Sequence, residues 1–131
     1  MSHAQEMFKL AQKTLANAYS PYSKYNVGCC IRSLSNQYYV GCNVENASYS
    51  LTCCAETAAI VQMIASGEKQ IKEIVLIAQS DKACVPCGAC RQRIREFAEL
   101  DTPIHMGNHE KIFFTKTLDK LLPDSFGPEF L

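Results

Sequence analysis

The sequence lacks a long apolar run, a block of like charges and a leader-like first segment. No apolar stretch approaches the roughly 20 residues that a membrane-spanning helix needs, so we expect no membrane partner. The first 13 residues are polar and have no apolar centre of the signal-peptide kind, which favours a cytoplasmic protein. Thirteen basic residues balance 13 acidic ones. A net charge of zero argues against a nucleic-acid polymer as partner, because such binding needs a concentrated basic surface.

Internal repeats, linkers and low-complexity tracts are missing as well. With 131 residues, 47% of them hydrophobic, the chain fits one domain over 1–131 that buries a core without covalent staples. Eight cysteines are nevertheless many for this length. A disulfide framework is not expected in a reducing compartment, and the adjacent pairs Cys29–Cys30 and Cys53–Cys54 disfavour it further. The cysteines therefore indicate metal or redox chemistry.

The pattern of apolar and polar residues predicts helices that alternate with strands. A capping box at Ser2–Gln5 begins a first helix, which ends before Ser20 and Pro21. The 52–65 segment is apolar almost all round and predicts a helix buried on most sides. The remaining predictions are a hairpin of strands at 27–31 and 38–42, a central strand at 71–78, short strands around 104 and at 112–115, helices at 88–100 and 118–122, and an extended arm at 123–131. This order predicts an α/β fold, a three-layer α-β-α sandwich with a mixed five-stranded sheet.

Three cysteines stand out by their place at predicted helix starts. Cys54 begins one helix, and Cys87 and Cys90 begin the next as Pro-Cys-Gly-Ala-Cys. The positive end of a helix favours thiolate over thiol, and therefore favours metal ligation. Three protein ligands leave a fourth tetrahedral position open, which is the catalytic rather than the structural zinc pattern. Glu56, two residues after Cys54, faces away from the ligand's own direction and is placed to move protons without binding the metal.

Other interpretations of these cysteines stay open at this point. A Cys-x-x-Cys at a helix start after a strand is also typical of thiol–disulfide oxidoreductases. A structural zinc module would bind one metal ion without turnover, although it would need a second closely spaced pair. Buried cysteines that only fill space are common, and this is the expected role of Cys29, Cys30, Cys42 and Cys84. The combination of Cys-Ala-Glu at one helix start with Pro-Cys-x-x-Cys at another favours a zinc-dependent deaminase.

With these residues, the chain resembles the small homotetrameric class of cytidine deaminases over nearly its whole length. The segments that carry the resemblance are Ser20–Tyr25, Gly41–Ala47, Cys54–Glu56, Pro86–Gln92 and Leu121–Glu129. The resemblance implies one zinc ion per chain and hydrolysis of cytidine and deoxycytidine to uridine and deoxyuridine, as in pyrimidine salvage. The alternative with the same chemistry is a deaminase of another aminopyrimidine nucleoside, such as the blasticidin type. The presence of Asn43, Glu45 and Phe126 argues against this alternative.

The resemblance also implies which residues bind the nucleoside. Asn43 and Glu45 are expected to hold the ribose. They lie two positions apart at a strand end, so their side chains face the same side of the strand. Polar residues at this place are also common because they stabilise the turn after a strand, which is the alternative explanation. A carboxylate at Glu45 would repel a phosphate, so a free nucleoside is expected rather than a nucleotide. Tyr25 takes the place of a phenylalanine beside the pyrimidine, and its added hydroxyl needs a partner. N–H groups near Ala55 are expected to hold the pyrimidine O2.

Two aromatic residues are expected, by the same resemblance, to act across a subunit boundary. Tyr49 and Phe126 would reach a neighbouring subunit's pocket, so the active sites of a homotetramer would be shared. The sequence departs from the family at Thr57, where an arginine usually donates to the zinc thiolates. Three features are candidates to compensate for this missing charge: the two helix N-termini, Arg91 beside Cys90, and the Thr57 hydroxyl. A smaller departure is Val85, where a serine is frequent.

Overall fold

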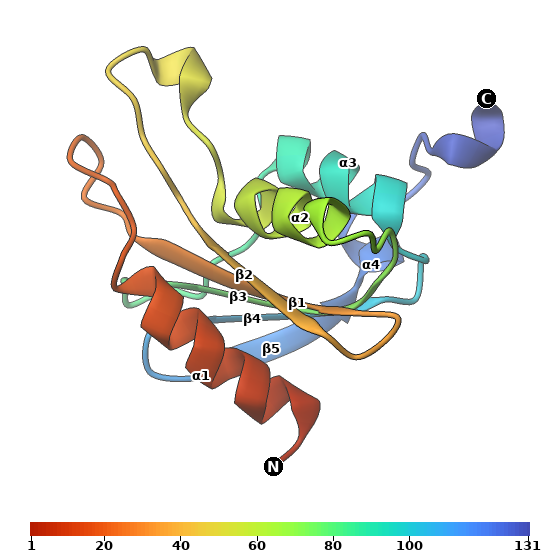
Figure 1. Cartoon of the computed structure of the whole chain (residues 1–131), viewed down its shortest axis with the longest axis horizontal. Coiled ribbons are helices and arrows are strands. Elements are labelled where there is room, and N and C mark those ends of the chain that lie inside the picture. The colour runs from red at the N-terminus through yellow and green to blue at the C-terminus, as the bar shows by residue number, and fades with distance from the viewer.

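A central five-stranded sheet, with helices on both faces, forms the body of the molecule in the computed structural model, which describes all 131 residues. Helix α1 covers one face, while α2 and α3 cover the other (Figure 1). The strand order is β2-β1-β3-β4-β5; β3 and β4 are parallel and the other neighbours are antiparallel. The elements are α1 (His3–Leu15), β1 (Val27–Ser33), β2 (Tyr38–Cys42), η1 (Tyr49–Leu51), α2 (Ala55–Ala65), β3 (Ile71–Ala78), α3 (Gly88–Phe97), β4 (Pro103–Asn108), β5 (Ile112–Thr117), α4 (Leu118–Leu121) and η2 (Pro128–Phe130). The predicted three-layer α/β sandwich with a mixed sheet is confirmed.

Each face of the sheet buries its own core, because successive side chains of a strand point to opposite faces. The adjacent residues Cys29 and Cys30 illustrate this, since Cys29 lies in the core under α2 and Cys30 in the core under α1. Strand β3 contributes side chains to both cores, which explains its nearly continuous apolar sequence. None of the helices has the length and apolar character needed to span a membrane.

The element boundaries follow local pairing more closely than the apolar pattern does. Helix α2 begins at Ala55 rather than at residue 52, because Cys53 pairs with Val44 in an isolated bridge and Cys54 is the N-cap. Helix α3 ends at Phe97 rather than at residue 100, because Ala98 forms a bridge with Ile71 at the start of β3. The 123–131 arm is not fully extended, since its last residues form the short helix η2. The predicted capping box of α1 is present in full.

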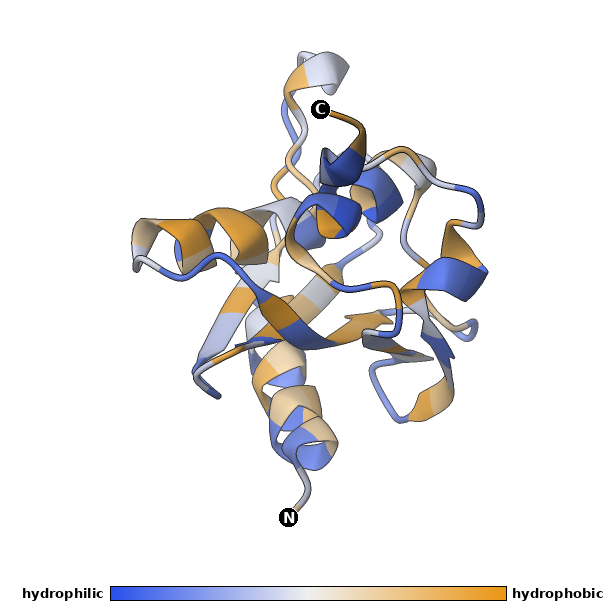
Figure 2. Cartoon of the chain, turned by 90° about the vertical axis from the view of Figure 1, so that its right-hand side faces the viewer, coloured by the Kyte–Doolittle hydropathy of each residue, from blue (hydrophilic) through white to orange (hydrophobic).

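Helix α2 is not buried on most sides, contrary to the sequence-based prediction. Its inner residues, such as Ala59 and Met63, are fully buried, but Val61 is 56% exposed and Ile64 38% exposed. In Figure 2 this helix is coloured mostly as hydrophobic, whereas α3 is mostly hydrophilic. The helix is therefore as apolar as its sequence indicates, but the rest of the chain covers only one side of it.

Candidate active site

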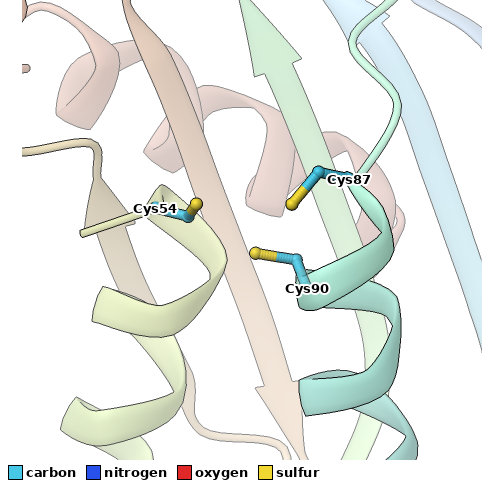
Figure 3. Close-up of side chains that lie close together, drawn as sticks. All are labelled: Cys54, Cys87 and Cys90. Atoms are coloured by element: carbon cyan, nitrogen blue, oxygen red, sulfur yellow. The ribbon is translucent and has the colours of Figure 1, made fainter. Parts of the chain in front are cut away.

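Three sulfur atoms from two helices converge at one end of the α2–α3 layer. Cys54 is the N-cap of α2, Cys87 is the N-cap of α3, and Cys90 lies in the first turn of α3. Their Sγ atoms all lie within 4.8 Å of one another and form a group that can hold a metal ion. Figure 3 shows the three side chains pointing toward a common centre. A two-cysteine redox motif would not need the third sulfur, which arrives from a different helix.

The position of these cysteines favours negative charge on sulfur. Neither N-cap thiol makes a side-chain capping bond, so both remain free for a ligand at the positive ends of two helices. A hydrogen bond from the Cys90 thiol lowers the pKa of Cys54 to about 6, assisted by Cys87 and by the charge of Arg93 and opposed by burial. The same bond, together with burial, raises the pKa of Cys90. The cluster therefore holds a first thiolate readily, and metal binding displaces the remaining protons.

Glu56 lies beside the cysteines and is 5% exposed. Burial raises the pKa of its carboxyl, and the nearby Cys54 acts in the same direction. Both residues line a cavity of about 200 Å³. Its walls, from several elements, are Tyr25, Val27, Asn43, Thr52, Cys54, Ala55, Glu56, Cys84, Val85 and Cys87. A buried carboxyl group, two of the three clustered cysteines and an apolar wall thus share one small space.

Asn43 and Tyr25 are tied together in the wall of this cavity. The Asn43 amide accepts from the Val27 N–H at 2.9 Å and donates to the Tyr25 carbonyl at 2.8 Å. Burial first, and then the neighbouring Cys84, raises the pKa of Tyr25. The main chain of Ala55 supplies one of the first N–H groups of α2, which have no acceptor within the helix.

Glu45 and Tyr49 line a second hollow of about 340 Å³, which shares Thr52 with the cysteine cavity. The Glu45 carboxylate accepts from the N–H groups of Tyr22 and Ser23, at 3.0 and 3.1 Å, and from the Ser23 hydroxyl. The Ser23 hydroxyl is the largest cause that lowers the pKa of Glu45. Glu45 is therefore a charged carboxylate held at the mouth of the site.

Phe126 is not brought into the cavity of its own chain. Its ring stacks on Phe130, with the centroids 5.3 Å apart, and is 57% exposed on the C-terminal tail. The tail stands away from the sheet (Figure 1). Gln92 donates to the Phe126 carbonyl at 2.9 Å, and Arg95 donates to the Ser125 hydroxyl at 2.8 Å. The backbone of the tail is therefore anchored to α3, while its aromatic rings face outward.

The charges around the sulfurs differ from the sequence-based expectation. The Arg91 guanidinium donates to the carbonyls of Pro86 and Leu121, both at 2.7 Å, so it ties the α3 start to α4 instead of facing the cluster. The Thr57 hydroxyl is buried and has no hydrogen-bond partner. Arg93 is the residue that reaches the cluster, with Nη1 donating to Cys90 Sγ at 3.8 Å. Neither Arg91 nor Thr57 donates a hydrogen bond to one of the three sulfurs.

Sequence reasoning missed three further residues of this region. The sequence could have identified Arg93 as a neighbour of the cysteine cluster, because it lies three residues after Cys90 and therefore on the same helix face. Thr52 and Val27 line the cavity without any chemical signal in the sequence. Among the remaining cysteines, Cys29 and Cys30 are fully buried as predicted, while Cys84 is buried but also lines the cavity. Cys42, for which burial was predicted as well, is only partly buried.

Comparison with protein families gives one matching model. Residues 1–106 match the model described as "Cytidine and deoxycytidylate deaminase zinc-binding region". The chain is 35% identical over 127 residues to the cytidine deaminase of Sporosarcina psychrophila, covering 97% of this chain and 93% of that protein. It is 38% identical over 117 residues to the cytidine deaminase of Mycoplasma pneumoniae, with 88% and 87% covered.

Solved structures give the same result for the fold. The cytidine deaminase of Burkholderia pseudomallei superposes with a TM-score of 0.90 at 32% identity, covering 96% of this chain and all (100%) of that chain. The cytidine deaminase of Mycobacterium tuberculosis superposes with a TM-score of 0.83 at 32% identity, with 94% and 96% covered. The similarity therefore includes the sheet, both helix layers and the cysteine-bearing helix starts.

Proposed function

The chain belongs to the cytidine and deoxycytidylate deaminase family, zinc-dependent hydrolases acting on a carbon–nitrogen bond, and we propose that its own substrates are free cytidine and deoxycytidine. Water replaces the amino group at C4 of the base, which gives uridine or deoxyuridine and ammonia. One observation carries the proposal: the sulfurs of Cys54, Cys87 and Cys90 lie within 4.8 Å of one another, and Glu56 lines the same cavity as Cys54 and Cys87.

The donor set suits zinc. Three cysteines are an accepted ligand set for this ion, and three protein ligands leave one tetrahedral position for chemistry. Zinc–sulfur bonds of about 2.3 Å place the sulfurs of a tetrahedral site about 3.8 Å apart, a spacing compatible with the separations of at most 4.8 Å found here. When bound, zinc acts as a Lewis acid that activates the attacking water. One ion per chain follows from the single three-sulfur group.

Glu56 moves the protons of the reaction in this proposal. It takes one proton from the attacking water and delivers it to N3 of the base while oxygen adds to C4. The second water proton then passes, again through Glu56, to the amine nitrogen. The C4–N4 bond breaks, ammonia leaves, and the C4 oxygen becomes a carbonyl. Glu56 is suited to this task because it is buried beside the ligand cysteines without belonging to the metal-binding group.

The walls of the cavity orient the base and the sugar. Tyr25 packs beside the pyrimidine, and an N–H at Ala55 donates to O2. Asn43 and Glu45 hold the ribose hydroxyls at the junction where the two hollows share Thr52. Because the Glu45 carboxylate is ionised and lines the adjoining hollow, a 5′-phosphate is repelled and a nucleoside is preferred over a nucleotide.

We also propose a homotetramer with shared active sites. Apolar side chains are exposed on η1, α2 and the tail, including Tyr49 at 76%, Val61 at 56% and Phe126 at 57% exposure. Such surface costs free energy in water unless another subunit covers it. Tyr49 and Phe126 then contribute rings to a neighbouring subunit's cavity. Light scattering should give four chains per particle, and activity should fall on dilution below the assembly constant.

A cytoplasmic location completes the proposal. Three ligand sulfurs must stay reduced to bind zinc, and a reducing compartment provides that condition. Cell fractionation of a tagged chain tests this point, and recovery only in an exported or membrane fraction would contradict it.

The central test follows the ultraviolet absorbance of substrates incubated with zinc-loaded protein. Cytidine and deoxycytidine should be converted, whereas cytosine and cytidine monophosphate should react much more slowly. Glu45→Gln should reduce the discrimination against the monophosphate, since it removes the repelling charge and keeps the shape. Intact cytidine after incubation with protein that carries one zinc per chain would sink the proposal.

A further inference from the structure

Arg93 shares one face of α3 with the two cysteines of that helix. Residues 87, 90 and 93 follow at three-residue spacing, which brings their side chains together along the helix surface. Arg93 Nη1 donates to Cys90 Sγ at 3.8 Å. The Arg93 side chain forms no ion pair and no other side-chain hydrogen bond, so Cys90 is its one polar partner in the chain.

The cysteine cluster needs positive charge. One Zn²⁺ with three thiolates has a formal charge of −1, and the neighbouring Glu56 adds another when it is ionised. Each of the two helix N-termini contributes the equivalent of about half a positive charge. On α2, the residue after Glu56 is the uncharged Thr57, whose hydroxyl has no partner.

Arg93 is the basic side chain that meets this need. Arg91 donates to the carbonyls of Pro86 and Leu121, and Arg95 donates to the tail. Arg93 is therefore the basic side chain of α3 that donates directly to a ligand cysteine.

We propose that Arg93 is the positioning residue that balances the three-thiolate zinc site, acting from α3 through its N–H···S bond to Cys90. The bond withdraws electron density from the thiolate, so the sulfur donates less to zinc and the ion remains the stronger Lewis acid. Arg93 touches no substrate in this role and acts only through the ligand. The inference rests on the proposed function, because it concerns the metal of the same site.

Cobalt substitution tests the proposal without requiring turnover. The wavelength of a sulfur-to-cobalt charge-transfer band reports how tightly the thiolate holds its electrons. An N–H···S bond stabilises these electrons and therefore moves the band to shorter wavelength. Arg93→Gln should therefore shift the band to longer wavelength at full cobalt occupancy, and Arg93→Lys, which keeps the charge, should restore part of the shift. Lys72→Gln is the matched control, since this exposed charge lies on β3 near the C-terminal end of α3, away from the cysteines.

Kinetics of the zinc enzyme give a second readout. Arg93→Gln should lower kcat about tenfold, on the scale of one lost charge-assisted hydrogen bond, and should change the KM for cytidine by less than about twofold. A wild-type wavelength in Arg93→Gln, or an equal shift in Lys72→Gln, overturns the proposal for Arg93. Failure of the wild-type enzyme to deaminate cytidine overturns the proposed function instead, and the cobalt band still decides the role of Arg93.

Discussion

Gly41 of β2 lies against the first turn of α2 so closely that a Cβ atom there would stand 2.4 Å from the carbonyl oxygen of Ala55. The main-chain nitrogen of Ala59 would lie 2.5 Å away. Because both contacts are with backbone, no side-chain rotation relieves them. This close approach sets the distance of the Cys54 and Glu56 helix start from the sheet.

Gly41→Ala should therefore lower both stability and zinc affinity. Overpacking of this kind costs about 1–3 kcal/mol, and the displaced α2 start moves Cys54 relative to Cys87 and Cys90. Urea unfolding and competition with a zinc chelator measure the two effects. Gly88→Ala is the control for stability, because a Cβ there meets nothing within 4 Å. Equal stabilities of the two variants would contradict the packing argument.

Glu56→Gln should abolish most turnover while it leaves the metal in place. The amide keeps the shape of the carboxylate but cannot take a proton from water, so kcat should fall by at least about 10²–10⁴-fold. Zinc content by mass spectrometry and the circular dichroism spectrum should match those of the wild type. Glu96→Gln on the exposed side of α3 provides a control for the loss of one carboxylate. Near-normal deamination by Glu56→Gln would refute the assigned role.

Arg95→Gln should release the C-terminal tail. The Arg95 side chain is 8% exposed and joins α3 to the tail through the Ser125 hydroxyl and the Glu129 carboxylate. Gly127 packs directly on the guanidinium, where a Cβ would lie 2.4 Å from Arg95 Cζ. Limited proteolysis followed by mass spectrometry should show faster cleavage within 123–131. Because Phe126 is proposed to complete a neighbouring site, the activity should fall as well. An unchanged cleavage rate would argue against the anchor.

Glu68 should make the stability depend on acidic pH. Hydrogen bonds from Ser35, Ser33 and Tyr39 lower its pKa to about 2 from an ordinary value of 4.5. A carboxyl with a lowered folded-state pKa stabilises the fold fully above its unfolded value, and this contribution disappears as the pH falls toward 2. Glu68→Gln should therefore be less stable than the wild type at neutral pH. The difference should shrink below pH 4.5, as measured by denaturation at several pH values. A difference independent of pH would rule out the charge as its cause.

The charge partner of the thiolates shows where sequence adjacency misleads. Arg91 follows Cys90 directly, but neighbouring residues on a helix point about 100° apart. Arg91 therefore turns to the carbonyls of Pro86 and Leu121. Arg93, three residues on, shares the face of Cys90. Helical periodicity would have selected it once Cys90 was placed on a helix.

The sequence by itself determined the elements and the chemistry of the site. Apolar periodicity, one capping box and two helix-start cysteine motifs are local signals, and local signals fix helix positions, strand positions and residue types. The combination of Cys-Ala-Glu with Pro-Cys-x-x-Cys also pointed to Cys54, Cys87, Cys90 and Glu56 before any spatial information, because this combination is typical of zinc-dependent deaminases.

Only the tertiary structure decided how distant segments meet. The bridges of Cys53 with Val44 and of Ala98 with Ile71 shortened two helices, since pairing with a segment distant in the sequence outweighed weak helical propensity. The exposure of one side of α2 and of the Phe126 ring depends on which other segments pack against them, and a local sequence pattern does not contain this information. The cysteine triad itself is a long-range contact, because packing of α2 and α3 on one sheet brings residue 54 to residues 87 and 90.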